Sequence, residues 1–402
     1  MYAKCGDLAK AQELLESLHL RNIVSWNALI SRYTEEGQYY EAFSCLERMK
    51  SEGISPNGVT FICILKSCGG IRDIERGKEI RDDIKKRGML KNEVVLGTAL
   101  IDMYAKCGFV EKARDILREL PSRNEISFNI LMAGYIQQGQ CDEALSCFKW
   151  MQSEGISPSI STFICILKAC AGTDSMDKGE QIHNEILDSI LIERDPRLGT
   201  TLVDMYAKCG ILSKAQEVLE QLPIQDVVSW NALIAGYSLQ GQGYEALNCF
   251  ESMQIKGISP NEVTFLCVLS ACCHSGLSNE AEQIFMHMIK KHGIIPNLEH
   301  HTCMIVVFGC AGHFDNAISV IKAMPYFNDP TIWLTLLGAC KKWGNVKLGL
   351  VAFDQTIQLH VSCATAYILM ADIFWASGMP EDAKYVEAMM KKYVITPKAE
   401  GK

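Results

Sequence analysis

Residues 229–260 read SWNALIAGYSLQGQGYEALNCFESMQIKGISP, and this stretch decides the fold. Its first half carries apolar residues at positions i, i+3, i+4 and i+7, which form one face of a helix: Trp230, Leu233, Ile234 and Tyr237. A second helix is marked in the same way by Ala246, Phe250 and Met253. Glycines at 241–243 separate the two helices, and G-I-S-P at 257–260 ends the second, because proline is poorly tolerated inside a helix. The stretch predicts a helical hairpin.

The same pattern recurs along the chain with a spacing of 102 residues. Residues 127–158 repeat the stretch almost position by position. The hexapeptide MYAKCG begins at Met1, Met103 and Met205, and a decayed copy, VFGCAG, begins at Val307. Cysteines follow the same spacing in four columns, which contain Cys5, Cys45, Cys63 and Cys68 with their counterparts 102 residues further on. Self-similarity of this kind is typical of a solenoid.

Each 102-residue block divides into three hairpin units of unequal length. Residues 196–226, 227–261 and 262–297 form units of 31, 35 and 36 residues. A lone hairpin cannot bury its apolar stripe, so neighbouring hairpins must stack. We therefore predict an all-α fold, a right-handed α-solenoid superhelix of stacked helix-turn-helix repeats with one concave face. The expected organisation is a partial unit at 1–22, tandem repeats at 23–329, degenerate units at 330–397 and a tail at 398–402. Met1 corresponds to a mid-unit position, so we expect that the chain begins inside a repeat.

Composition bounds the class of protein. The 402 residues are 48% apolar and 21% charged, which is enough to bury a large core. The net charge of −8 opposes a simple nucleic-acid reading, because phosphate-binding surfaces usually carry excess Lys and Arg. No apolar run reaches the length of a membrane-spanning helix, and no membrane partner is expected. The 18 cysteines lie mostly within helical patterns, which favours core packing in a reducing compartment over disulfides.

The repeat motifs resemble those of a known family. The alternation of 35-, 36- and 31-residue units, W-N-A-L-I at Trp26 and Trp230, D-M-Y-A-K-C-G at Asp102 and Asp204, and the G-I-S-P closers are similar to plant pentatricopeptide repeat proteins of the PLS subclass. In that scheme residues 1–22 are a partial S-type unit, 23–329 are P, L and S units, and 330–397 look like the subclass's E domain. The resemblance implies single-stranded organellar RNA as the partner and C-to-U RNA editing as the role, in mitochondria or chloroplasts.

The resemblance also implies which residues read bases. In the family the readers are the fifth and the last residue of a unit, and each unit reads one base. The corresponding pairs are Asn27 with Asn57, Thr98 with Asn124, Asn129 with Ser159, Thr200 with Asp226, Asn231 with Asn261, and Thr302 with Asp329. By family rules these pairs imply the RNA sequence Y-N-A-Y-N-G-Y-N-G, where Y is a pyrimidine and N is any base. The long units place Ile62, Ile164 and Leu266 at the reading position, and aliphatic side chains cannot discriminate bases by hydrogen bonding.

A second position is implied to flank the base. In the family the unit's second residue lies beside the base, where an apolar side chain can form a sandwich. The residues at this position are Val24, Val95, Ile126, Arg197 and Val228. Arg197 departs from the apolar pattern and could stack or touch phosphate, and Glu299 departs from it with a charge that would repel phosphate.

The sequence gives little support for chemistry in cis. Editing deaminases hold zinc with an H-x-E motif followed by P-C-x-x-C. His183-Asn184-Glu185 matches the first half, but the chain contains no C-x-x-C, so we predict that it is not an enzyme and that a deaminase or other editing factor acts in trans through the E-like region. His300, His301 and Cys303 could bind a metal, but a helix start on a solvated or half-buried face is the favoured interpretation. No cofactor is expected.

Other interpretations remain open at this level. A protein-binding scaffold of the tetratricopeptide type has a 34-residue period, equal to the mean of the three unit lengths. The unequal units and the absence of W-x-x-L-G-x-x-Y argue against it. An RNA-binding role in splicing or transcript stability is a second alternative. The charge runs at 85–87 and 290–291 are interpreted as solvated faces, and Trp26 and Trp230 as packing residues rather than base-stacking platforms.

Overall fold

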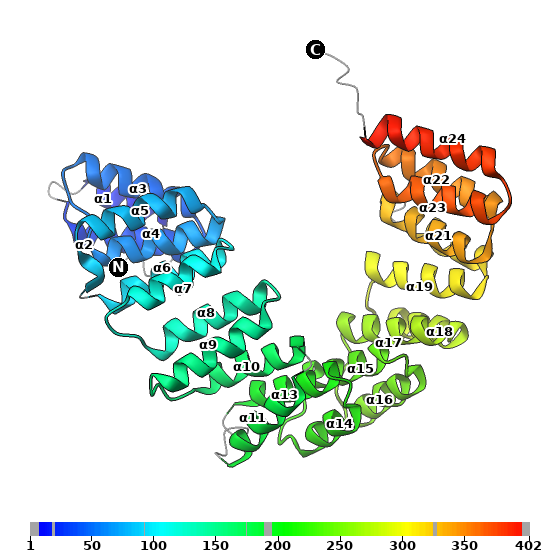
Figure 1. Cartoon of the computed structure of the whole chain (residues 1–402), viewed down its shortest axis with the longest axis horizontal. Helices are drawn as coiled ribbons and strands as arrows, with labels where there is room; N and C mark the ends of the chain where they lie inside the picture. Colours follow the sequence, from blue (N-terminus) through cyan, green and yellow to red (C-terminus); the bar gives the residue numbers. More distant parts are fainter. Residues whose placement is uncertain are drawn as a thin grey trace. The chain divides into compact units, whose positions relative to one another are not determined.

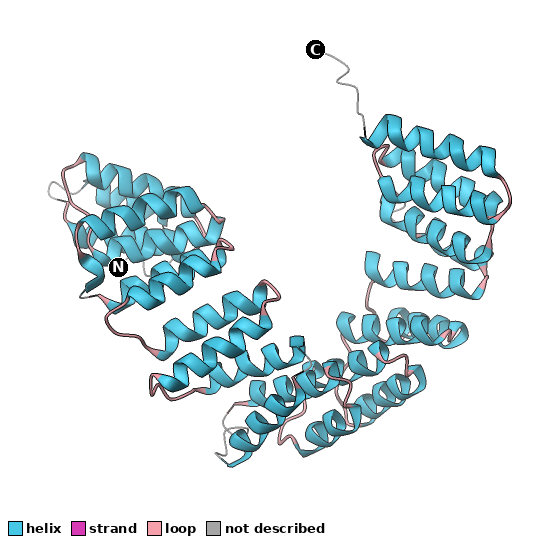
Figure 2. Ribbon diagram, viewed as in Figure 1, coloured by secondary structure: helices cyan, strands magenta, loops and turns pink. Residues whose placement is uncertain are grey.

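The computed structural model describes residues 8–17, 21–91, 93–173, 175–188, 195–324 and 328–395. Every regular element within these residues is a helix (Figure 2). The copy of MYAKCG at Met1 and the tail at 398–402 lie outside the described residues. The expected all-α repeat solenoid is confirmed, and across the described residues no helix is long and apolar enough to cross a membrane.

First and second helices of hairpins alternate along the chain (Figure 1). The first helices are α2 (Ile23–Glu35), α4 (Gly58–Ile71), α6 (Val94–Lys106), α8 (Glu125–Gln137), α10 (Ile160–Thr173), α13 (Pro196–Lys208), α15 (Val227–Leu239), α17 (Glu262–Ser275), α19 (Leu298–Ala311), α21 (Pro330–Trp343) and α23 (Ala364–Ala376). The second helices are α1 (Leu8–Ser17), α3 (Tyr39–Ser51), α5 (Ile74–Lys86), α7 (Val110–Glu119), α9 (Cys141–Ser153), α11 (Met176–Asp188), α14 (Leu212–Gln221), α16 (Gly243–Ile255), α18 (Ser278–Lys290), α20 (Phe314–Ala323), α22 (Val346–Leu359) and α24 (Pro380–Met390). A 3₁₀ turn, η2 (Met89–Lys91), and a π-helical turn, η3 (Lys391–Ile395), complete the set.

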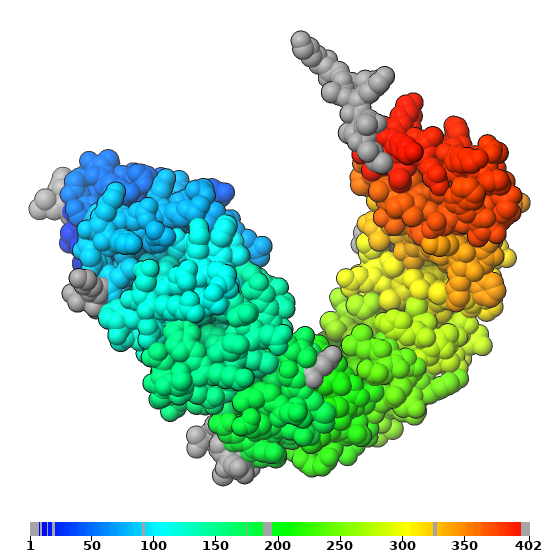
Figure 3. All heavy atoms as spheres, viewed as in Figure 1, coloured from blue at the N-terminus to red at the C-terminus, as the bar shows by residue number. Residues whose placement is uncertain are grey.

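The chain divides into two compact units, Met1–Thr201 and Leu202–Lys402. Within each unit a first helix packs against the second helix of its own hairpin and against the first helix of the next hairpin. In the first unit α4, α6 and α8 follow one another in this way, and in the second unit α17, α19 and α21 do so. The space-filling view shows that side chains close the space between neighbouring hairpins (Figure 3).

The apolar stripes predicted from the sequence form the core. Trp230, Leu233, Ile234 and Tyr237 are all buried, as are Ala246, Phe250 and Met253 on the second helix. Trp26 is completely buried, and its indole nitrogen donates a hydrogen bond to Glu52 at 3.1 Å. The interpretation of both tryptophans as packing residues is therefore confirmed.

Local chemistry sets where the helices begin and end. Six first helices start with a capping box, in which the cap side chain accepts from the third helical backbone N–H and the third side chain bonds back: the caps are Asn22, Asn57, Asn124, Asp226, Asn261 and Asn297. Gly241 and Gly257 adopt left-handed φ angles of 66° and 78° just past α15 and α16, where other residues would be strained. The glycine signals in residues 229–260 thus mark the turns as predicted.

The cysteine columns pack inside the stack. Every cysteine of the described residues is a free thiol, and most are buried or half-buried. Burial raises the pKa of the Cys147 and Cys249 thiols to about 12, and that of Cys45 to about 11. A thiol with so high a pKa is neither a good nucleophile nor a good metal ligand near neutral pH. The columns of Cys45 and Cys68 are buried core residues, as predicted, whereas Cys107, Cys209, Cys165 and Cys267 are only half-buried and Cys5 lies outside the described residues.

Two mid-helix glycines allow close approach of neighbouring hairpins. A Cβ atom on Gly236 of α15 would lie 2.7 Å from the Cβ of Ala207 and 2.8 Å from a methyl group of Leu212. A Cβ on Gly134 of α8 would lie 3.0 Å from the Cβ of Ala105. The A-G-Y motif therefore marks a helix contact that only glycine permits, at the cost of a weaker intrinsic helix preference.

We expect Gly236→Ala to destabilise the second unit although alanine is the better helix former. The gain in helix propensity, about 1 kcal/mol, is smaller than the overpacking cost of about 1–3 kcal/mol at this contact. The matched control is Gly338→Ala in α21, where a Cβ would meet no atom within 4 Å, so this change should raise stability. Thermal melts followed by circular dichroism compare the two variants, and a higher melting temperature for Gly236→Ala would refute the close-contact interpretation.

Candidate nucleic-acid interface

The expected reading pairs come from two different hairpins. The fifth residue of a unit lies on its first helix, and the last residue caps the first helix of the next unit. Because successive first helices pack side by side, these positions meet at the hairpin junction. At the first junction Asn27 Nδ2 donates to Asn57 Oδ1 at 3.0 Å, and the Thr60 hydroxyl donates to Asn27 Oδ1 at 2.6 Å. The structure brings this pair into direct contact.

The cap fixes the orientation of the Asn57 amide. Its Oδ1 accepts from the Thr60 backbone N–H at 3.1 Å, and it lies 3.1 Å from the Thr60 hydroxyl, whose single proton is donated to Asn27. A backbone N–H can only donate, so the carbonyl oxygen must face the helix and the NH₂ group must face away from it. The Asn57 NH₂ has no partner among the described residues. The junction therefore presents hydrogen-bond donors.

The Asn231–Asn261 junction repeats this arrangement with one difference. Asn231 Nδ2 donates to Asn261 Oδ1 at 3.3 Å, and the Thr264 hydroxyl donates to the same oxygen at 3.0 Å. Asn231 Oδ1 is buried and has no partner among the described residues. Asn27 and Asn231 are only 9% and 7% exposed, so they form the floor of the surface instead of projecting from it.

The Asn129–Ser159 pair is joined through a third residue that the sequence analysis missed. Asn129 Nδ2 donates to Glu125 Oε1 at 2.9 Å, and the Ser159 hydroxyl donates to the same carboxylate oxygen. The Thr162 hydroxyl donates to Asn129 Oδ1 at 2.8 Å. Glu125 is the first residue of α8, one turn before Asn129, and this i, i+4 spacing was the available signal. An acceptor thus lies inside this junction.

The threonine readers use their hydroxyls within their own helices. Each donates to the carbonyl four residues earlier, with distances of 3.0, 3.2 and 2.8 Å for Thr98, Thr200 and Thr302. A hydroxyl that donates in this way keeps its lone pairs as acceptors. The last residues of these units are also caps: Asn124 accepts from Ser127 N at 2.9 Å, and Asp226 accepts from Ser229 N at 2.8 Å. No hydrogen bond between the described side chains joins Thr98 to Asn124.

Asp329 completes the set of last residues as the cap of α21, where it accepts from Thr331 N at 2.8 Å. All six last residues therefore lie at the start of a first helix, Ser159 through its bond with Thr162 N at 3.4 Å. One oxygen of each is occupied by the cap. The atom left over is an NH₂ in the asparagines and a second carboxylate oxygen in the aspartates.

The flanking positions form a column of exposed side chains. Val24, Val95, Ile126 and Val228 are 71%, 64%, 60% and 56% exposed, although each lies in the first turn of a helix. Val59 and Val263, each 53% exposed, hold the same second position in long units. These two valines were not predicted from the sequence, although the unit register places them at the same position as Val24. Arg197 is exposed and pairs with Asp195 at 2.6 Å.

The other candidate motifs form no site in the described residues. His183 is buried on α11. His300 and His301 are buried, not solvated or half-buried as expected, because His300 fills the capping-box position opposite Asn297. The His300 ring also contacts the Glu262 carbonyl at 2.9 Å, and burial lowers the pKa of His301. Among the residues that the structure describes, no three His, Cys, Asp or Glu side chains gather as a metal site.

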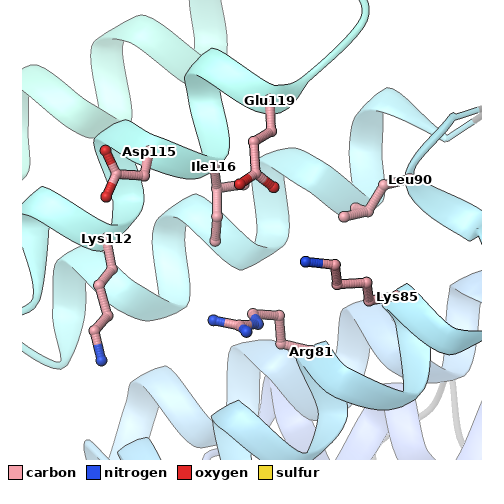
Figure 4. Close-up of a pocket in the computed structure, with 7 residues that line it drawn as sticks. All are labelled: Arg81, Lys85, Leu90, Lys112, Asp115, Ile116 and Glu119. Carbon is pink, nitrogen blue, oxygen red and sulfur yellow. The ribbon is translucent and has the colours of Figure 1, made fainter.

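One pocket of about 240 Å³ lies apart from the reading pairs (Figure 4). It is lined by Arg81 and Lys85 of α5, Leu90 of η2, and Lys112, Asp115, Ile116 and Glu119 of α7. Its walls come from second helices, and it carries both signs of charge. The pocket is a polar seam between successive second helices and contributes nothing to the reading surface.

Comparison with known proteins agrees with this architecture. A family model described as "PPR repeat family" matches residues 21–70, 123–172 and 225–274, "Pentatricopeptide repeat domain" matches 253–310, and "PPR repeat" matches 98–125 and 299–328. The chain is 19% identical to the pentatricopeptide repeat protein PPR10 in a crystal structure with an 18-nt psaJ RNA element, with a TM-score of 0.75 over 98% of this chain and 59% of that one. This likeness shows the fold.

Curated relatives from Arabidopsis thaliana extend over almost all of the chain. Pentatricopeptide repeat-containing protein At4g38010 is 35% identical over 393 residues, which is 97% of this chain and 69% of the relative. The chloroplastic protein CRR2 is 35% identical, with coverage of 97% and 60%, and the mitochondrial protein At2g22410 is 33% identical, with coverage of 98% and 62%. The chain thus spans between 60% and 69% of the length of these three. With these matches and the stacked hairpins, the chain belongs to the pentatricopeptide repeat family.

Proposed function

We propose that the chain is a sequence-specific single-stranded RNA-binding adaptor for organellar C-to-U editing, of the PLS subclass with E-type C-terminal units. It reads one base at each junction that carries a polar pair. The observation that carries this proposal is the fixed orientation of the cap side chains, which leaves one polar atom of defined character open wherever the last residue of a pair is Asn or Asp.

The open atoms account for base choice in chemical terms. The free NH₂ of Asn57 suits the N3 and O2 acceptors of cytosine, whereas N3 of uracil carries a proton. The free NH₂ of Asn124 suits N1 of adenine in the same way. The open carboxylate oxygen of Asp226 instead accepts from the N1–H and N2–H₂ groups of guanine. These preferences agree with the sequence Y-N-A-Y-N-G-Y-N-G inferred from the family rules.

The column of exposed apolar side chains supports the same function. Unpaired bases bind proteins by stacking on apolar or aromatic groups, and Val24, Val95 and Val228 lie at the second position of their first helices. Contacts of this kind do not require a positive molecule, which reconciles RNA binding with a net charge of −8. PPR10, whose fold this chain shares, was crystallised with RNA. Relatives named mitochondrial and chloroplastic support an organellar location.

The last two hairpins supply a surface for the proposed editing partner. Several large apolar side chains are exposed there: Trp343, Val351, Ile368, Trp375 and Tyr385 are between 47% and 67% exposed. Clustered exposed apolar groups mark protein-interaction surfaces. We assign this region, the E-like units, to the recruitment of a deaminase supplied in trans.

Asp226→Asn is expected to change base preference from guanine to adenine at the sixth nucleotide of the site. The exchange replaces the open oxygen by an NH₂ group while keeping the helix cap, because Asn and Asp cap helices about equally well. We expect a preference change of about tenfold or more in Kd, measured with paired oligonucleotides that differ at this base.

Asp73→Asn is the matched control for this exchange. Asp73 caps the second helix α5, where it accepts from Arg76 N at 3.1 Å, away from every reading pair. It should leave base preference unchanged at all positions. Equal behaviour of the two variants would contradict the role assigned to the caps.

Selection from a randomised RNA pool tests the register of the whole site. Retained RNAs should be enriched in pyrimidines at the first, fourth and seventh positions and in purines at the third, sixth and ninth. The positions facing Ile62, Ile164 and Leu266 should stay random, because aliphatic groups cannot hydrogen-bond a base. A pool that emerges without enrichment would favour the protein-binding scaffold over the RNA adaptor.

Tyr385→Glu tests the partner surface. Tyr385 is 67% exposed on α24, so a charge there should disturb docking without disturbing the fold. We expect at least a tenfold loss in binding of a purified DYW-type deaminase domain and no change in RNA affinity. Tyr244→Glu on α16, where the tyrosine is 60% exposed, is the control. If both variants bind the deaminase domain as the unmodified chain does, the E-like region is not its docking site.

A further inference from the structure

The reading face of each first helix extends beyond the second and fifth residues. The second, fifth and ninth residues are separated by three and four positions, so they form one stripe along the helix. On α4 this stripe contains Val59, Ile62 and Lys66. Val59 and Lys66 are exposed and Ile62 is half-buried between them. The stripe therefore ends in a cation that faces the same side as the reading position.

The next long unit has the same ending. On α10 the fifth residue is Ile164 and the ninth is Lys168, which is also exposed. In these two of the three long units an aliphatic side chain at the reading position is followed one turn later by a lysine, whereas in the third Leu266 is followed by Ser270. The two short units that follow them differ, because Asp102 and Asp204 occupy their ninth position.

The ammonium groups of these two lysines are free to bind an anion. Neither Lys66 nor Lys168 forms an ion pair or a side-chain hydrogen bond with any described residue. By contrast, Lys106 and Lys208 in the short units are paired with Asp102 and Asp204 at 2.7 and 2.8 Å. An ammonium group without an ion pair can bind an anion at no loss of a protein contact. An ammonium group that is already paired with a carboxylate must divide its interaction between the carboxylate and the anion.

Glu35 is an acid that shares the surroundings of Lys66, and its carboxylate already has partners. Lys66 and Glu35 both act on the Cys63 thiol, so they lie on the same side of the junction. Glu35 is held by Arg32 at 3.2 Å and by the Ser31 hydroxyl at 3.3 Å. Lys168 is the charged group that acts on the neighbouring Cys165 thiol.

We propose that Lys66 and Lys168 bind phosphodiester groups of the RNA, so that the long units on α4 and α10 hold the backbone of nucleotides they do not read. This inference rests on the proposed RNA binding. A unit with an aliphatic residue at the reading position forms no hydrogen bond with the edge of a base. The RNA strand must nevertheless pass along this unit in register to reach the next polar pair. A lysine suits this task because it acts on phosphate as a point charge without regard to sequence.

The test is the salt dependence of RNA affinity for Lys66→Gln, Lys168→Gln and the double variant. The slope of log K against log salt is negative, and for a single strand each lost phosphate contact makes it less negative by about 0.7. The slope for the double variant should therefore be less negative by about 1.4. This variant should also bind RNA several-fold more weakly at low salt, with its base preference unchanged. Lys149→Gln on the second helix α9 is the matched control, because Lys149 is exposed and has no ion pair with any residue that the structure describes, and it should keep the original slope.

The outcomes separate the two levels of the proposal. If the unmodified chain prefers a matched over a scrambled oligonucleotide and the double variant keeps its slope, the phosphate role is refuted and the RNA adaptor stands. A loss of slope in Lys149→Gln equal to that in Lys66→Gln would also refute it, because the effect would then be one of total charge. If the unmodified chain shows no preference for the matched oligonucleotide, both proposals fail. Circular dichroism confirms that each variant is folded.

Discussion

The close contact between first helices of successive hairpins is the constraint on which the rest of the structure depends. No hairpin can bury its stripe of large apolar residues alone, so each relies on its neighbour for a core. On α15, a Cβ atom added to Gly236 would lie too close to the Cβ of Ala207 on the preceding first helix. This spacing fixes the position of each helix start relative to the preceding helix, and with it the geometry of every junction.

The reading positions are a product of that geometry. Asn27 and Asn57 are thirty residues apart in sequence, yet they share a hydrogen bond because one lies on a first helix and the other caps the next. The polar side chains at a junction satisfy one another in the unbound chain, which keeps buried groups such as Asn27 from being left without partners. The buried oxygen of Asn231, which has no partner among the described residues, is the exception at these junctions.

Periodicity made the fold readable from the sequence, and the helical hairpins, the buried Trp230 stripe and the packed cysteine columns were all predicted on that basis. The unit register also carried Val59 and Val263, which were overlooked although they occupy the same position as Val24. Other features depend on how side chains from two hairpins meet. Glu125 as a bridge between Asn129 and Ser159, and the burial of His300 as part of a cap, require the placement of neighbouring helices, which a one-dimensional pattern does not contain.

The cap residues start a helix and, in the proposed function, also contact a base, so few residue types can occupy these positions. A residue that must start a helix is drawn from a small set of short polar side chains, so folding itself restricts the side chains available to the proposed RNA-reading surface. Within that set, Asn and Asp differ by one terminal group and by little in their effect on stability. Under the proposed function, an exchange between Asn and Asp at a cap would therefore change base preference while the helix start is kept, so that folding and specificity are separable at these positions.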